Sequence, residues 1–234
     1  QRCYDEIIHD LSIEKQHVII GIDRAGIVGN DGETHQGLFD VAMLSSVPGI
    51  TVYSPATYEE LRKTLYESIY HQTGVCCVRY PRGGEGKLPA GFAPDEAWSV
   101  RSISPKSPRK KLGLVTYGKE TVQVCKAAEQ LKEQGIAVSV LKLLRLLPFP
   151  EDSLRPLMGC DAILFVEEGI QSGGIGQMFG EKLLERQYRG EYRILAVDNR
   201  FVEQASTDRA LALTGLDAAG IVRTCQTWLG IAAD

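Results

Sequence analysis

The sequence predicts an α/β protein of two domains, each with a mainly parallel sheet flanked by helices. Short apolar runs alternate with segments of helical periodicity in both halves of the chain, which is typical of parallel sheets. A stretch rich in Gly, Pro, Ser and Lys separates these halves. We therefore expect a first domain over 1–83, a linker over 84–110 and a second domain over 111–234.

In the first domain, helices and strands are expected to alternate. HVIIGID (17–23) is a continuous apolar run that ends in a charge, as buried parallel strands do. Helices are expected over about 2–12, 36–46 and 57–72, and strands over 17–23, 49–55 and 75–80.

The second domain repeats this rhythm. Strands are expected over 112–118, 137–143, 162–168 and 193–198, and helices over 119–134, 174–188 and 217–230. Within the linker, AWSVRSI (97–103) is the one piece expected to be ordered.

Composition excludes several classes of protein. The net charge of −4 indicates no nucleic-acid partner. No apolar run reaches the roughly 18 residues that a membrane span needs, and the polar opening QRCYDE is unlike a signal peptide. The six cysteines form no CxxC pair, which favours reduced thiols in a cytoplasmic protein. The chain opens on Gln1 inside a helical pattern, so we expect it to be part of a longer protein.

Residues 22–37, IDRAGIVGNDGETHQG, are the strongest candidate site. They follow a buried strand, and ligands of open α/β sheets lie at the carboxyl ends of strands. Arg24, Asp31 and His35 place a cation, a carboxylate and an imidazole on one loop, which suits an anionic substrate and proton transfer. The alternative is a solvated turn in which Thr34 caps a helix.

The turn VRYPRGG (78–84) is the second candidate. Side chains alternate along a strand, so at most one of Arg79 and Arg82 is expected to face a given site. Arg82 lies in the turn, and its planar guanidinium suits a phosphate. A surface salt bridge is an equally good interpretation of these residues.

The glycine-rich stretch 165–180 is a weaker candidate. GGIGQMFG departs from the dinucleotide-binding fingerprint because its final glycine comes one position late. A packing turn or subunit contact is the better interpretation. The adjacent Glu167 and Glu168 are expected to point apart and to make a poor acid/base pair.

Four stretches together resemble 1-deoxy-D-xylulose-5-phosphate synthases in order and spacing: QRCYDEIIHD, IDRAGIVGNDGETHQGLFD, PGITVYSPATYEEL and VRYPRGG. VEEG…GGIGQ and GLDAAGI extend the resemblance to nearly the whole chain. The resemblance implies part of a transketolase pyrimidine-binding domain followed by a transketolase C-terminal domain. It also implies a homodimer and the cofactors thiamine diphosphate and Mg²⁺.

The implied reaction is a transfer in which pyruvate loses CO₂ and its remaining carbons join D-glyceraldehyde 3-phosphate. The product, 1-deoxy-D-xylulose 5-phosphate, is a precursor of isoprenoids, thiamine and pyridoxal. By position, Arg24 and Arg82 match residues that hold the acceptor phosphate. Asp31 would bond substrate hydroxyls, His35 would orient or protonate oxygen, and Arg2 would lie near the cofactor.

The family's GDG…N motif, which holds diphosphate and Mg²⁺, is absent from the sequence, so no metal ligand is expected in this chain. The glutamate that activates the cofactor lies upstream of residue 1 in the family. We therefore expect these residues to be inactive without the N-terminal half of such an enzyme. Two alternatives stay open: the β subunit of a 2-oxo-acid dehydrogenase E1 component, and a non-catalytic transketolase-like assembly module.

Overall fold

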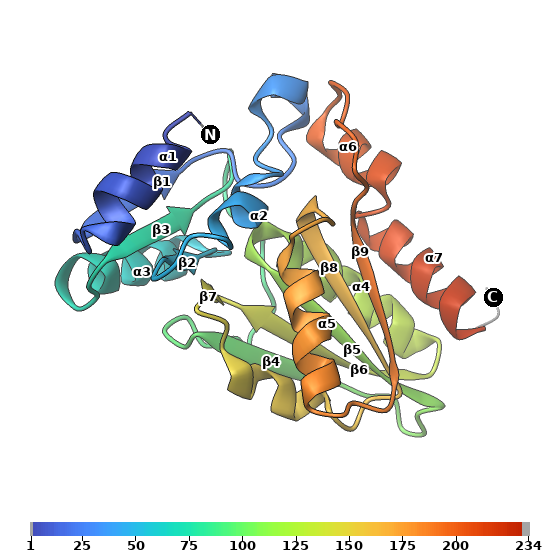
Figure 1. The fold of residues 1–234 in the computed structure, drawn as a ribbon. Coiled ribbons are helices and arrows are strands. Elements are labelled where there is room, and N and C mark those ends of the chain that lie inside the picture. The colour runs from blue at the N-terminus through green and yellow to red at the C-terminus, as the bar shows by residue number, and fades with distance from the viewer. Residues whose placement is uncertain (1, 231–234) are drawn as a thin grey trace.

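The computed structural model describes residues 2–230, which form two mostly parallel sheets flanked by helices (Figure 1). The first sheet has four strands in the order β1-β3-β2-β7. The second has five, in the order β4-β6-β5-β8-β9. The predicted α/β class with two mainly parallel sheets is confirmed.

The elements around the first sheet come mainly from the first third of the chain. An opening α1 turn (Tyr4–Glu6) continues into a wider π-helical segment (Ile7–Ile13), so the predicted first helix is present in two parts. The rest are β1 (Val18–Ile22), short 3₁₀ turns at Gly29–Asp31 and Glu33–His35, α2 (Asp40–Leu44), β2 (Thr51–Tyr53), α3 (Tyr58–Tyr70) and β3 (Val75–Arg79). The predicted helix over 36–46 is shorter because the loop before it continues to Phe39.

The second sheet and its helices follow the predicted rhythm with additions. Its elements are β4 (Trp98–Ile103), β5 (Lys110–Tyr117), a 3₁₀ turn (Gly118–Glu120), α4 (Thr121–Glu133), β6 (Ile136–Leu143), β7 (Arg145–Leu147), a 3₁₀ helix (Glu151–Leu157), β8 (Ala162–Ile170), α5 (Ile175–Glu185), β9 (Glu191–Val197), α6 (Thr207–Thr214) and α7 (Ala218–Leu229). The sequence pattern did not predict β7 or α6.

Two antiparallel edge strands modify the predicted division into domains. β4 lies inside the expected linker, yet it pairs along its whole length with β6 of the second sheet. β7 follows β6 in the chain but pairs with β2 of the first sheet. The boundaries 1–83, 84–110 and 111–234 stay a prediction, although the backbone pairing shows that each sheet extends beyond them.

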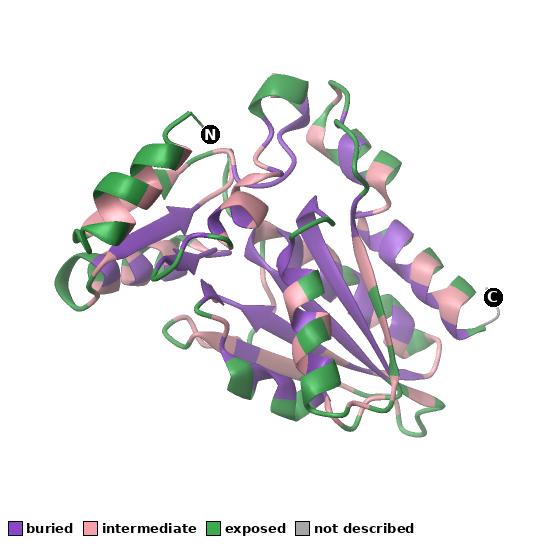
Figure 2. Cartoon of the chain, viewed as in Figure 1, coloured by how far each residue is buried: buried purple, intermediate pink, exposed green. Residues whose placement is uncertain are grey.

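Buried residues lie along the strands of both sheets (Figure 2). One apolar cluster joins β2 and β3 of the first sheet to β5, β6 and β8 of the second. Four of the six cysteines, Cys76, Cys77, Cys125 and Cys225, are buried free thiols. Among the described residues, no helix is long and apolar enough to cross a membrane.

A buried ion pair also joins the two units of the fold, by which we mean each sheet together with the helices that flank it. Lys142 on β6 and Glu60 on α3 are almost completely inaccessible and form a salt bridge. The second oxygen of Glu60 accepts a hydrogen bond from the backbone N–H of Ala56 at 2.7 Å. The Lys142 ammonium lies 5.7 Å from the centre of the Phe92 ring. Because both charges are out of water, each depends on the other for its stabilisation.

Replacing Lys142 alone should therefore destabilise the chain strongly. We expect Lys142→Met to lower the free energy of unfolding by about 3 kcal/mol, because Glu60 is left buried and unpaired. Adding Glu60→Gln should restore part of the loss, and Lys126→Met on the exposed face of α4 should change it by less than about 0.5 kcal/mol. Urea unfolding measures all three. Equal losses for the two lysine variants would contradict the role given to the pair.

Candidate functional site

The two candidate segments meet at one edge of the first sheet. Residues 23–37 follow β1, and the turn that contains Arg82 follows β3. β1 and β3 are parallel neighbours, with Ile22 beside Arg79 at their carboxyl ends. Backbone hydrogen bonds continue past the strands, since Ala25 N–H donates to the Tyr80 carbonyl at 3.0 Å. The sheet topology thus brings together segments that lie about fifty residues apart.

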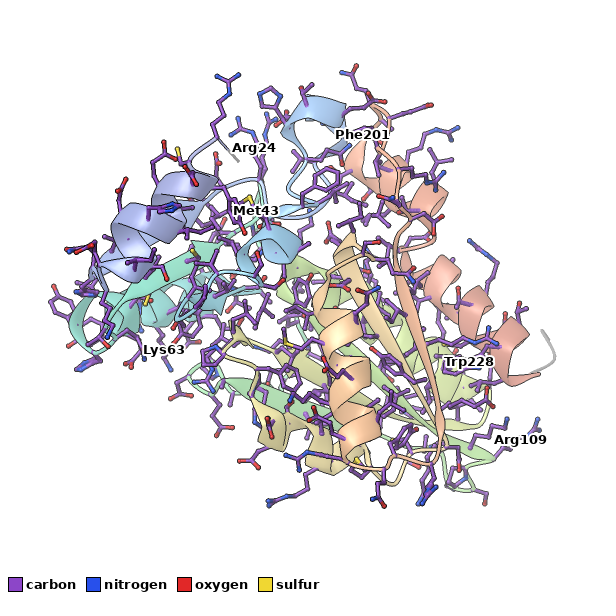
Figure 3. The ribbon with its side chains drawn as sticks, in the orientation of Figure 1. Arg24, Met43, Lys63, Arg109, Phe201 and Trp228 are labelled. Carbon is purple, nitrogen blue, oxygen red and sulfur yellow. The ribbon has the colours of Figure 1, made fainter. Side chains whose placement is uncertain are left out.

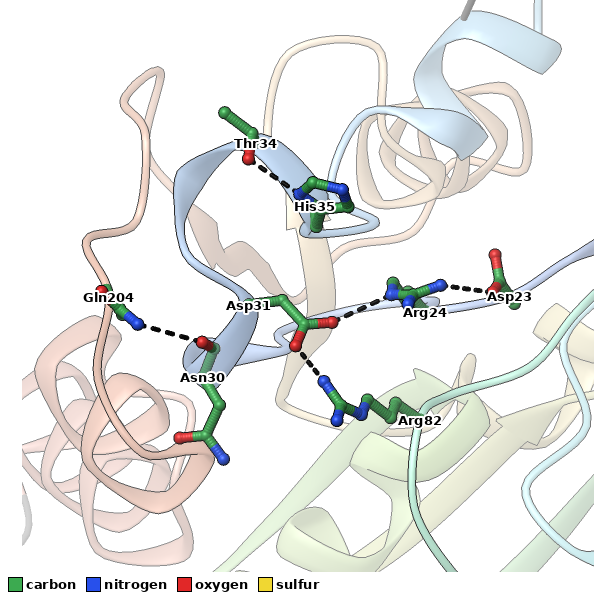
Figure 4. Close-up of polar contacts among 8 residues, drawn as sticks. All are labelled: Asp23, Arg24, Asn30, Asp31, Thr34, His35, Arg82 and Gln204. Atoms are coloured by element: carbon green, nitrogen blue, oxygen red, sulfur yellow. Dashed lines mark hydrogen bonds and ion pairs between the residues drawn. The ribbon is translucent and has the colours of Figure 1, made fainter.

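Arg24, Asp31 and Arg82 form one ionic cluster at this edge (Figure 4). The Arg24 Nε donates to Asp31 Oδ2 at 2.9 Å, and an Arg82 guanidinium nitrogen donates to Asp31 Oδ1. Arg24 also donates to Asp23 at 2.6 Å. One carboxylate therefore holds two guanidinium groups from separate segments close together.

The cluster favours the charged forms of Arg24 and Asp31. The hydrogen bond from Arg24 lowers the pKa of Asp31 below its ordinary value, and the Arg82 contact acts in the same direction. The bond to Asp31 likewise raises the pKa of Arg24. Arg24 has a φ of 58°, a left-handed conformation that costs a residue with a Cβ atom roughly 1–2 kcal/mol. Such local strain is common at binding and catalytic positions.

His35 and Arg2 stand apart from these bonds. The His35 ring is exposed, and its Nδ1 lies 2.8 Å from the Thr34 hydroxyl (Figure 4). Thr34 therefore contacts His35 and caps neither the 3₁₀ turn nor α2, so the capping role predicted for it is wrong. Arg2 is exposed in the turn before α1. Their expected roles stay predictions, as do those of Arg24, Asp31 and Arg82.

The second unit holds the loop in place. Ala205 N–H donates to the Gly29 carbonyl at 3.1 Å, and the Gln204 side chain donates to the Asn30 carbonyl at 3.1 Å. Beside them, the Phe39 and Phe201 rings pack edge to face with centres 5.9 Å apart. Arg24 and Phe201 lie at the same end of the molecule (Figure 3). The loop thus packs against a segment that the sequence analysis did not connect with it.

Arg79 lies beneath the loop, apart from the Arg82 cluster. It is 3% exposed, and it donates to both carboxylate oxygens of Asp40, at 2.9 and 3.2 Å. It also donates to the Ser54 hydroxyl and the Gly37 carbonyl. Burial is the largest effect and disfavours the charge, but Asp40, Tyr117 and Glu168 together outweigh it and raise the pKa of Arg79. Arg79 and Arg82 therefore have different partners, as alternation along the strand predicted.

Glu167 and Glu168 also serve different partners. Glu167 accepts a hydrogen bond from the Tyr117 hydroxyl at 2.7 Å and from the first backbone N–H groups of α5. Glu168 faces the loop, where its Oε2 accepts from Ile27 N–H at 2.7 Å. The two carboxylates therefore do not act on one atom. A Cβ atom at Gly174 would lie 2.5 Å from Glu167 Oε1, so the glycine-rich stretch before α5 is a turn that packs against Glu167.

The described residues do not build the metal end of a thiamine site. No group of three or more His, Cys, Asp or Glu side chains among residues 2–230 is placed to hold a metal ion. The donors at the strand edge are cationic and bonded to Asp31, which suits an anion and not Mg²⁺. We therefore assign no catalytic step to the cofactor through these residues.

Two mostly parallel sheets flanked by helices define an α/β protein whose cluster of Arg24, Asp31 and Arg82 lies where the strands of the first sheet end. The chain belongs to the transketolase family. The family model described as "Transketolase, C-terminal domain" matches residues 103–221, and that described as "Transketolase, pyrimidine binding domain" matches residues 1–85.

Among curated proteins, the chain is similar to enzymes that share one name. The 1-deoxy-D-xylulose-5-phosphate synthase of Synechococcus sp. (strain JA-3-3Ab) is 35% identical over 225 residues, which is 94% of this chain and 34% of the relative. The enzyme of that name from Enterobacter sp. (strain 638) is 34% identical over 230 residues, 98% of this chain and 36% of the relative. The chain thus spans about a third of the length of these relatives.

Solved structures agree on the architecture. A structure described as "Split gene transketolase, inactive beta4 tetramer" has a TM-score of 0.83 and 25% identity, and the match covers 99% of this chain and 73% of that one. A transketolase mutant from Pichia stipitis has a TM-score of 0.72, with 21% identity over 92% of this chain and 30% of its own. The second likeness supports the fold alone.

Gly26 provides a test of the contact between loop and second unit. Its φ is +81°, and a Cβ atom there would lie 2.6 Å from Glu168 Oε2. Gly49 has a similar φ of +72° but nothing within 4 Å. We expect Gly49→Ala to cost about 1–2 kcal/mol of unfolding free energy from the backbone alone, and Gly26→Ala roughly 1–3 kcal/mol more. Urea unfolding compares them, and equal costs would contradict the observed packing.

Proposed function

We propose that this chain is the acceptor-binding part of a thiamine-diphosphate-dependent synthase. The enzyme would condense pyruvate with D-glyceraldehyde 3-phosphate and release CO₂. The product, 1-deoxy-D-xylulose 5-phosphate, is a precursor of isoprenoids, thiamine and pyridoxal. The curated relatives carry the name of this activity. The observation that carries the proposal is the meeting of Arg24 and Arg82 on one carboxylate, because two fixed guanidinium groups suit a phosphate dianion.

In this proposal the side chains have separate tasks. Arg24 and Arg82 bind the acceptor phosphate, and Asp31 accepts hydrogen bonds from substrate hydroxyls. Its lowered pKa keeps Asp31 ionised at neutral pH, as an acceptor must be. His35 is exposed on the same loop and would exchange a proton with the aldehyde oxygen. Arg2 would lie near the cofactor, which supplies the carbanion chemistry when bound.

We propose further that the chain needs another polypeptide segment to be active. The described residues provide cationic and proton-handling groups but no cluster of metal ligands. A family member that binds Mg²⁺ and diphosphate would take those ligands from elsewhere in its assembly. We also propose a homodimer as the unit of assembly, since sites of this family lie between domains and subunits.

A second candidate has a specific observation in its favour. The solved structure that this chain covers to 73% is described as "Split gene transketolase, inactive beta4 tetramer". This chain could likewise be one subunit of a two-gene enzyme, including the β subunit of a 2-oxo-acid dehydrogenase E1 component. For such a subunit we propose no role for Arg24 and Arg82 in binding an acceptor phosphate. A non-catalytic assembly module would need neither arginine nor His35.

The arginine pair is tested directly by anion binding. We expect Arg24→Gln and Arg82→Gln each to weaken binding of inorganic phosphate about tenfold to a hundredfold, since a hydrogen bond to a charged group contributes roughly 1.5–3 kcal/mol. Arg223→Gln, an exposed arginine on α7, is the matched control and should have no effect. Calorimetric titration measures the affinities. Unchanged binding in the Arg82 variant would exclude the phosphate site.

The need for a second segment is tested by activity. We expect this chain, supplied with thiamine diphosphate, Mg²⁺, pyruvate and D-glyceraldehyde 3-phosphate, to release no 1-deoxy-D-xylulose 5-phosphate detectable by mass spectrometry. The protein translated from the complete reading frame, or the complex of its separate subunits, should release it and should lose activity in Arg82→Gln. Product from the chain by itself would refute the need for a second segment. Turnover of pyruvate with no dependence on Arg82 would favour the dehydrogenase.

A further inference from the structure

Glu168 is the point at which the second unit reaches the candidate loop. It lies on β8, is 5% exposed, and its Oε2 accepts the hydrogen bond from Ile27 N–H across 141 positions of sequence. The same side chain packs against Gly26, where only a residue without a Cβ atom fits. The position of the Glu168 side chain therefore fixes the backbone at Gly26 and Ile27, two and three residues after Arg24.

A second buried carboxyl group belongs to Glu120, in the 3₁₀ turn that contacts β8, where Glu168 lies close enough to act on it electrostatically. It is 1% exposed, and within the described residues neither of its oxygens has a hydrogen-bond partner. A buried carboxylate without a donor is strongly disfavoured, and two such groups side by side cannot both be ionised at low cost. Burial, followed by the negative charge of Glu168, raises the pKa of Glu120 well above its ordinary value.

The other charged groups around the pair do not neutralise Glu120. Lys119 precedes it and favours its ionisation, but the two form no ion pair in the part of the chain that the structure describes. Asp217 adds negative charge, and its own Oδ1 caps α7 by accepting from Gly220 N–H. Arg79 faces Glu168 but is hydrogen-bonded to Asp40.

We propose that Glu168 is a positioning residue for the loop that carries Arg24 and Asp31, and that a protonated Glu120 holds it there. The Glu120 hydroxyl would donate to Glu168 Oε1, which leaves Oε2 for Ile27 N–H. Loss of the Glu120 proton would place two negative charges together, displace Glu168 and free the Ile27 amide. The inference depends on the proposed function only because that loop carries the proposed phosphate site.

The pH dependence of stability follows from the direction of the shift. The folded chain keeps the Glu120 proton at pH values where the unfolded chain has lost it. Stability is therefore fully present below the ordinary glutamate pKa and falls as the pH rises towards the folded pKa. Glu120→Gln removes this dependence, because its amide N–H can donate to Glu168 at every pH.

The test is urea unfolding of the chain and of Glu120→Gln between pH 5 and 9. We expect the folding equilibrium constant of the unsubstituted chain, relative to the variant, to fall by up to about tenfold per pH unit over the window of the shift. Glu133→Gln, an exposed glutamate at the end of α4, should follow the unsubstituted chain. If the ratio of the folding equilibrium constant of the unsubstituted chain to that of Glu120→Gln stays constant with pH, the proposal is overturned.

Hydrogen exchange of the Ile27 amide provides a second measurement if Glu120→Gln folds poorly. After correction for the intrinsic effect of pH, protection of this amide in the unsubstituted chain should decrease as the pH rises. Glu168→Ala should abolish that protection at every pH, and unchanged protection in either case overturns the proposal. Neither readout uses substrate. If stability and Ile27 protection show no pH effect while phosphate binding depends on Arg24 and Arg82, only this inference is refuted. If the pH effect is present while phosphate binding does not depend on the arginines, only the proposed function is refuted.

Discussion

The buried guanidinium of Arg79 is the charge around which the junction of the two sheets is organised. An arginine removed from water is tolerated only where carboxylate and carbonyl groups replace its hydration. Asp40, Ser54 and the Gly37 carbonyl do so here, and they fix the start of α2 and the end of the candidate loop. The guanidinium carbon also lies 5.3 Å from the centre of the Tyr117 ring, in the second unit. The loop and the second sheet therefore share one electrostatic anchor.

The same principle extends across the junction. The Tyr117 hydroxyl donates to Glu167, which receives the first N–H groups of α5. Burial and the nearby Glu167 raise the pKa of Tyr117, so it stays a donor at neutral pH. The neighbouring Glu168 points to the opposite side and holds Ile27. Two consecutive residues of β8 thus connect the second sheet to α5 and to the candidate loop.

Much of the candidate site could be predicted from local sequence. Arg24, Asp31 and His35 lie on one glycine-rich loop, and Arg82 lies in a turn after a strand, so the residue types alone indicated an anion site. Their joint position also followed from the rule that parallel strands present their carboxyl ends at one edge. The separation of His35 from the ionic cluster could not be predicted, because it depends on the 3₁₀ turns within the loop.

The sequence by itself determined the α/β class, nearly all of the longer strands and helices, and the chemical character of the loop, since these depend on local periodicity and residue type. Only the tertiary structure decided that β7 completes the first sheet, that β4 belongs to the second, and that Gln204 and Ala205 hold the loop. Only it brought Glu120 beside Glu168. Such pairings join residues far apart in sequence, and no local pattern encodes which distant backbone or carboxyl group will be nearest once both are buried.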